Sequence, residues 1–262
     1  MLRGIYTAGA GMGVEQAQMD VLSNNLVNAA TNGYKKDRAV QLPFSQLLLV
    51  QRQQETVPGV NAGWVSVGLT NQGAAVRRVE TNFAPGLLQE TKEPAHLALL
   101  GENCFFAVNA PAPGDPAREL YTRDGEFFVD GEGYLVTARG ERVLGENGPV
   151  FLGEERDFFV SETGVVSTPR QGEIARLRLV EFADPAGLQK TGGNCFAAPP
   201  GAAAPALNPQ VRQGFLERSN VNVTAEMISV ITVLRAYEAN SRVLQAQNDL
   251  LGLAVNQVGS LR

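Results

Sequence analysis

The sequence predicts an α+β fold, in which N- and C-terminal helices pair as a coiled-coil-like bundle and a mainly antiparallel β-domain is inserted between them. Three observations predict it. Residues 222–262 carry a long heptad pattern, residues 1–33 carry a weaker version of it, and residues 75–211 alternate short β-prone runs with glycine-rich turns. The remaining segments, 34–74 and 212–221, are expected to be an extended connector and a return connector.

The N-terminal helix is predicted from apolar residues at alternating steps of three and four. Four glycines among the first thirteen residues weaken it, because each costs up to ~1 kcal/mol of helix stability relative to alanine. The pattern ends at Asn32-Gly33, and we expect Gly33 to adopt a left-handed conformation there. The predicted seam of this helix consists of Leu2, Ile5, Met12, Met19 and Leu26.

The C-terminal helix is predicted from a proline-free heptad pattern, long enough for one helix of roughly 55–60 Å at 1.5 Å per residue. Ser241 and Asn248 interrupt its apolar seam. Two interpretations are open for them, since a single polar residue in a seam either sets the register or faces solvent. The predicted seam consists of Val223, Met227, Val230, Leu234, Tyr237, Leu244, Leu251, Val255 and Val258.

Further apolar residues lie off this strict seam, at Ile228, Ile231, Leu250 and Leu253. A helix that is apolar over more than one stripe needs more than one neighbour. A simple two-helix hairpin within one chain would bury only one stripe. We therefore expect the terminal helices to pack between subunits as well.

The middle of the chain is predicted to form eight to twelve short antiparallel strands. Asparagine-glycine, aspartate-glycine and arginine-glycine pairs separate the β-prone runs and suit hairpin turns that need a positive φ. A further short strand is expected at Trp64–Val67, inside the connector. The expected turns are Asp124-Gly125, Asp130-Gly131, Arg139-Gly140 and Asn147-Gly148.

Composition narrows the class of function. The 262 residues are 44% hydrophobic and 19% charged, as in an ordinary globular protein. A formal net charge of −5 argues against nucleic acid as a partner, because phosphate binding needs clustered cations. No apolar run approaches the twenty residues of a membrane span, and the first residues do not have the pattern of a cleavable signal peptide.

No catalytic, cofactor or metal site is predicted. His96 is the only histidine, and it has no metal-ligand motif around it. Cys104 and Cys195 are interpreted as two small buried hydrophobic residues, with a disulfide as the alternative. Acidic residues in the hairpins are interpreted as turn formers, although a carboxylate pair of a glycosidase would also use such residues. They are Asp124, Glu126, Asp130, Glu132 and Glu141.

Two terminal motifs carry a resemblance to a known family. The run Met19–Lys35, and the runs Gly214–Val223 and Arg235–Ser241, are similar to the two signatures of the bacterial flagellar rod and hook axial proteins. Between them, Gly101–Val108 resembles a strand of that family, with Asn103-Cys104 as a departure. The resemblance covers essentially the whole chain. The motif residues are Asn24, Asn25, Asn28, Thr31, Gly33, Tyr34, Lys35, Ser219, Asn220, Asn222, Arg235, Tyr237 and Glu238.

The resemblance implies a structural, non-enzymatic subunit of the flagellar basal-body rod. It implies export through the flagellar type III apparatus, helical polymerisation outside the cytoplasmic membrane, and a place in the cell envelope. The implied partners are copies of the same chain, other rod and hook proteins, the export apparatus and ring proteins around the rod. Chain length and the string Ser219–Val223 favour the distal-rod branch. A proximal-rod or hook-type protein is the alternative, and a secreted carbohydrate binder or hydrolase is a more remote one.

Overall fold

The structure is a computed structural model that describes residues 2–43, 47–52, 64–70, 73–110, 118–153, 155, 157–206 and 209–259. The chain forms two compact units. The helical unit comprises Met1–Asn24, Asp37–Glu80 and Thr224–Arg262, and the β-domain comprises Asn25–Lys36 and Thr81–Val223. The end of the N-terminal motif therefore packs with the β-domain, although the sequence led us to group it with the helix.

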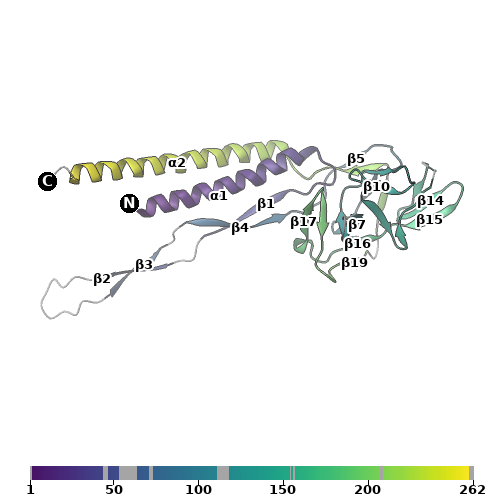
Figure 1. Ribbon diagram of the computed structural model, residues 1–262, viewed down its shortest axis with the longest axis horizontal. Helices are drawn as coiled ribbons and strands as arrows, with labels where there is room; N and C mark the ends of the chain where they lie inside the picture. Colours follow the sequence, from purple (N-terminus) through teal and green to yellow (C-terminus); the bar gives the residue numbers. More distant parts are fainter. Residues whose placement is uncertain are drawn as a thin grey trace. The chain divides into compact units, whose positions relative to one another are not determined.

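Two long helices form near the chain ends. Helix α1 (Leu2–Val27) continues into a short 3₁₀ turn, η1 (Asn28–Ala30), and helix α2 spans Val223–Gly259. The two helices lie side by side (Figure 1), with Gly11 of α1 close to the side chain of Asn240 of α2. In the described part of the chain, neither helix combines the length and the apolarity that crossing a membrane would need.

The segment expected to be a connector contains paired strands instead. Strand β1 (Asp37–Pro43) pairs with β4 (Ala74–Thr81), and β2 (Leu47–Arg52) runs antiparallel to β3 (Trp64–Thr70). The short strand predicted at Trp64–Val67 is the first half of β3. Strand β4 falls almost wholly in the segment 75–211, where strands were predicted, although it belongs to the helical unit. Strands β1 and β2 have no clear alternation of apolar and polar residues and were not predicted.

The β-domain is antiparallel, as predicted. Its main sheet has the order β17-β18-β8-β7-β11-β10-β9, with β16 also paired to β7, and β13-β14-β15 form a second sheet. Two pairs, β20 with β6 and β21 with β5, bring the return segment against early strands. The strands are β5 (Leu88–Glu90), β6 (Leu97–Leu99), β7 (Cys104–Ala110), β8 (Arg118–Thr122), β9 (Phe127–Val129), β10 (Leu135–Thr137), β11 (Arg142–Gly145), β12 (Gly148–Pro149), β13 (Phe159–Val160), β14 (Val165–Thr168), β15 (Gly172–Arg176), β16 (Leu179–Glu181), β17 (Gln189–Gly192), β18 (Cys195–Ala197), β19 (Ala204–Pro205), β20 (Val211–Gln213) and β21 (Phe215–Glu217).

Three of the four predicted hairpin turns are confirmed as connections between paired strands, and one is wrong. Gly140 and Gly148 have the expected positive φ, of 84° and 128°, in the β10–β11 and β11–β12 hairpins. The turn after β9 places its positive φ at Gly133 instead of Gly131. The strands around Asp124-Gly125 do not pair; a Cβ at Gly125 would lie 1.6 Å from the carbonyl oxygen of Leu97, so glycine is required there by close backbone approach.

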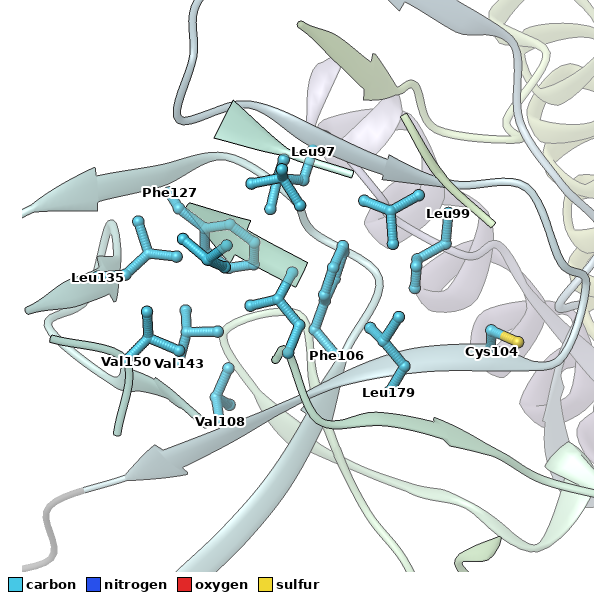
Figure 2. Close-up of a cluster of buried hydrophobic side chains, with 14 of the residues drawn as sticks. Leu97, Leu99, Cys104, Phe106, Val108, Phe127, Leu135, Val143, Val150 and Leu179 are labelled. Atoms are coloured by element: carbon cyan, nitrogen blue, oxygen red, sulfur yellow. The ribbon is translucent and has the colours of Figure 1, made fainter. Parts of the chain in front are cut away.

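Alternate residues of the strands fill the hydrophobic core drawn in Figure 2, and a second buried cluster includes Phe105, Phe182 and Phe196. Phe106 packs edge-on against Phe127, with ring centroids 5.1 Å apart, and both rings are almost fully buried. Cys104 and Cys195 are free buried thiols in this core, so the interpretation without a disulfide is confirmed. Other members are Leu97, Leu99, Val108, Leu135, Val143, Val150 and Leu179.

Replacing Phe106 with alanine should lower the free energy of unfolding of the β-domain by about 3–5 kcal/mol, because the site loses buried area and leaves a cavity. Urea unfolding followed by circular dichroism measures the loss. Phe159→Ala is the control, since Phe159 is 62% exposed, and it should change stability by less than about 0.5 kcal/mol. Equal losses in the two variants would contradict the assigned core.

Candidate functional site

The N-terminal motif leaves α1 through a tight turn that only glycine fits. Gly33 has φ +65°, and its N–H donates a 2.6 Å hydrogen bond to the carbonyl oxygen of Glu217. A Cβ at Gly33 would lie 2.6 Å from the backbone carbonyl group of Arg123. The predicted left-handed Gly33 is therefore confirmed, and close backbone packing is a second reason for glycine.

Two residues later, Lys35 turns its side chain into the β-domain. Its Nζ lies 2.6 Å from Oε1 of Glu217 and donates to the carbonyl oxygen of Ala84 at 2.9 Å. Glu217 Oε1 also accepts a 2.8 Å hydrogen bond from the N–H of Gly86. The side chains of Lys35 and Glu217 are 0% and 2% exposed, so this ion pair is shielded from water.

A second cation shares the same carboxylate. Arg123 Nη1 lies 3.5 Å from Oε2 of Glu217, an ion pair without hydrogen-bond geometry. Its Nη2 donates to the carbonyl oxygens of Gly101 and Glu102, and its guanidinium lies over the ring of Phe105 at 5.3 Å. We call Lys35, Arg123 and Glu217 the ionic cluster; it joins the two terminal motifs to the middle of the chain.

Burial dominates the electrostatics of the ionic cluster. Desolvation lowers the pKa of Lys35 and the pKa of Arg123, and the Glu217 charge opposes that shift in both. Removing a charge from water costs several kcal/mol per ion, and close opposite charges with good hydrogen bonds are needed to offset it. The cluster is therefore stable only while all three side chains are held together.

Asn220 of the second motif binds the same region through its side-chain amide. Its Oδ1 accepts a 2.8 Å hydrogen bond from the N–H of Lys36, and its Nδ2 donates to the carbonyl oxygens of Asn82 and Ala84 at 2.9 and 3.0 Å. Lys190 adds a contact from β17, because its Nζ lies 4.4 Å from the ring of Tyr34. Each of these contacts fixes the backbone on either side of Lys35.

Asn32 connects the turn to the acidic hairpins. Its Nδ2 donates to Oε2 of Glu126 at 2.8 Å, and its carbonyl oxygen accepts from Nδ2 of Asn194 at 2.7 Å. Beside it, burial raises the pKa of Asp124 to about 6, and the charges of Glu126 and Glu141 contribute in the same direction. Asn25 is also buried and accepts a hydrogen bond from the hydroxyl of Tyr34.

The acidic residues that we weighed as a carboxylate pair have structural partners. Asp130 Oδ1 accepts from the N–H groups of Glu132 and Tyr134, as a turn former does. Glu132 pairs with Arg142, and Glu141 accepts from Thr137 and Cys195. His96 Nδ1 lies 2.9 Å from Oγ1 of Thr91. Within the described residues, no three His, Cys, Asp or Glu side chains are grouped so that they would hold a metal ion.

The predicted seam residues are divided between two sides of the helices. Buried contacts of the helical unit include Ala8, Val14 and Val233, which sequence reasoning missed because it followed a different heptad phase. The side chains of Leu2 and Val258 lie outside the described residues. Ile5, Met12, Met19, Leu26, Val230, Tyr237, Leu244 and Leu251 are partly buried, whereas Val223, Met227, Leu234 and Val255 are exposed, as are the motif residues Asn24, Asn222, Arg235 and Glu238. Their role in contacts between subunits stays a prediction.

Replacing Glu217 with glutamine should cost about 3–5 kcal/mol of β-domain stability, because two buried cations lose their shared counter-charge. The further change Lys35→Met should cost less in the Glu217→Gln chain than in the unmodified chain, since it then removes an unpaired charge. Urea unfolding of the four chains measures this coupling. Glu132→Gln, which breaks the exposed pair with Arg142, is the control and should cost no more than about 1 kcal/mol. Additive losses at Glu217 and Lys35 would contradict the cluster.

The raised pKa of Asp124 predicts a pH effect on stability. The folded chain binds this proton more tightly than the unfolded chain does, so the contribution is present below about pH 4 and is lost as the pH rises through about 6. Asp124→Asn keeps the hydrogen bond from the Glu126 N–H and removes the titration. Relative to the unmodified chain, this variant should gain about 2 kcal/mol between pH 4 and pH 6.5. A constant difference between the two chains across that range would contradict the assignment.

Known proteins match the same three segments that meet in the ionic cluster. Family models described as "Flagella basal body rod protein", "Flagellar hook protein FlgE/F/G D1 domain" and "Flagellar basal body rod FlgEFG protein C-terminal" match residues 5–35, 100–168 and 212–257. Lys35, Arg123 and Glu217 come from one segment each. The signatures that we recognised at the two ends are therefore confirmed, and the cluster lies where they converge.

Relatives match over nearly the whole chain. The "Flagellar basal-body rod protein FlgG" of Borreliella burgdorferi is 31% identical over 98% of both chains. The proteins of the same name from Agrobacterium fabrum and Bacillus subtilis are 33% and 30% identical, over 96% and 98% of this chain and 98% and 99% of their own. The chain therefore belongs to the flagellar basal-body rod and hook protein family, as a structural subunit of the rod.

Proposed function

We propose that this chain is a distal-rod-type subunit that polymerises helically through its terminal helices into the drive shaft of the flagellum. The observation that carries the proposal is an exposed apolar face on α2, formed by Met227, Ile228, Ile231 and Leu234. These side chains are 40–60% exposed, although they are large and apolar. An apolar patch of this kind on a soluble chain marks a surface for a partner.

A second exposed apolar group follows along the same helix, at Val243, Leu250 and Leu253. Successive residues of an α-helix are rotated by about 100°, so the two groups face different directions around α2. The buried residue Val233 points to a third side, toward the interior of the helical unit. Two exposed apolar faces suit a helix that is packed by more than one neighbouring subunit, as in a helical polymer.

The ionic cluster has a complementary role in this proposal. It lies in the β-domain; in the sequence, Lys35 follows shortly after the end of α1 at Val27, and Glu217 shortly precedes the start of α2 at Val223. The chain segments that lead out of α1 and into α2 are thus anchored at one place by Lys35 and Glu217. A subunit that transmits torque needs such firm anchoring of these segments within the β-domain.

The proposal includes a non-enzymatic role, export by the flagellar type III apparatus, and a location outside the cytoplasmic membrane in the cell envelope. Its partners would be copies of the same chain, neighbouring rod and hook proteins, and ring proteins that surround the rod. Family membership supports these statements. The names of the three relatives above support the basal-body rod rather than the hook.

Ile231→Glu should block polymerisation of the full-length chain without unfolding it, because it places a charge in the exposed apolar face. We expect the concentration needed for fibres to rise by at least about tenfold, which corresponds to ~1.4 kcal/mol per contact. Sedimentation with negative-stain microscopy measures it. Gln245→Glu, at an exposed polar position of the same helix, is the matched control. Fibres from both variants at the same concentration would contradict the proposal.

A further inference from the structure

Helix α1 contains four glycines that the structure divides into two kinds. At Gly9 and Gly13 an added Cβ would meet nothing within 4 Å. At Gly11 it would lie 2.9 Å from Nδ2 of Asn240, and at Gly4 it would lie 3.4 Å from Cδ of Gln247. A Cβ at Gly11 would thus displace the end of the Asn240 side chain, whereas one at Gly4 would meet Gln247 at ordinary van der Waals distance. We call Gly4 and Gly11 notches, because each lies opposite a carboxamide side chain of α2 and the other two glycines do not.

The two notches share one register. From Gly4 to Gly11 the chain advances by seven residues along α1, and from Gln247 to Asn240 it goes back by seven residues along α2. The helices are therefore antiparallel at these contacts, with a one-heptad repeat between them. This period is the one that brings the same face of each helix back into contact.

Burying a carboxamide side chain in such a seam is energetically unfavourable unless the carboxamide is hydrogen-bonded. The neighbouring seam residues Ala8, Val14 and Val233 are buried apolar side chains. Oε1 of Gln247 is buried and makes no hydrogen bond in the part of the chain that the structure describes. An apolar residue would avoid this cost, whereas a polar residue in a helix seam makes one alignment better than its competitors.

We propose that Gly11 with Asn240, and Gly4 with Gln247, act as a register lock that selects this alignment of α1 and α2. A slide of half a heptad would bring a carboxamide opposite Ala8, whose methyl group fills the space that glycine leaves open. A slide of a full heptad in one direction would leave Asn240 opposite Gln18. The same slide in the other direction would move Gln247 past Gly4, where α1 has no residue opposite it. In the observed register alone, both notches are filled.

The polar residues that set the register in this proposal are Asn240 and Gln247, which lie opposite glycines of α1. The heptad pattern had singled out the next residue in each case, Ser241 and Asn248. The lock fixes the alignment of the helices along their axes, since a slide of a full heptad would keep the same side of α2 exposed. The lock concerns pairing within one chain, so it stands or falls separately from polymerisation.

Cysteine cross-linking of the full-length chain tests the lock. The observed register places Gln18 opposite Val233, and a one-heptad slide would place it opposite Glu226. Two chains, with Gln18→Cys and Val233→Cys or with Gln18→Cys and Glu226→Cys, are treated with a bismaleimide shorter than the heptad step of about 10 Å. The unmodified chain gives the background, since its own Cys104 and Cys195 are buried.

We expect the Val233 pair to cross-link about tenfold faster than the Glu226 pair. Adding Gly11→Ala should bring the two rates close together, and adding Asn240→Ala, which empties the notch without a clash, should do the same. Gly9→Ala is the matched control and should leave the ratio unchanged. Equal rates in the starting chains, an equal effect of Gly9→Ala and Gly11→Ala, or no cross-linking of either pair would each overturn the lock.

Discussion

Three distant segments of the β-domain are held together by the ion pairs of one buried carboxylate, that of Glu217. It neutralises Lys35 at 2.6 Å and Arg123 at 3.5 Å, with all three side chains almost fully shielded from water. Because desolvation of each ion is unfavourable, the cluster tolerates little displacement of any segment that supplies a partner. Close packing of the backbone around the cluster also requires glycine at two positions. A Cβ at Gly86 would lie 1.9 Å from the carbonyl oxygen of Arg218, and one at Gly33 would meet the backbone of Arg123.

The two units differ in how they use their polar and apolar residues. Charged and polar residues of the terminal motifs are used inside the β-domain, where Lys35, Asn220 and Glu217 hold segments far apart in sequence. Apolar residues of α2 are exposed, and we propose that other subunits cover them. Motif residues such as Lys35 and Asn220 thus make contacts within one chain. The proposed contacts between chains come from exposed side chains such as Met227 and Ile231.

Sequence reasoning predicted the parts of the fold that have a period. Two helices, an antiparallel inserted β-domain and the left-handed Gly33 are all present. It missed the ionic cluster, because charged residues ordinarily predict exposure and nothing local shows that Arg123 and Glu217 meet. Of the seam predicted on α2, four of the described residues are partly buried and four are exposed. Exposed and buried stripes of α2 are both apolar, and the buried one includes Asn240 and Gln247, so hydrophobicity alone could not separate them.

Amide hydrogen exchange at Gly33 and Gly86, in the unmodified chain and in the Glu217→Gln chain, tests the central claim most directly. The two N–H groups come from different segments and donate to the backbone and the side chain of Glu217. If the cluster holds these segments as one unit, both amides should exchange faster by a similar factor. Faster exchange at Gly86 alone would show that the carboxylate binds one loop and does not hold the three segments together.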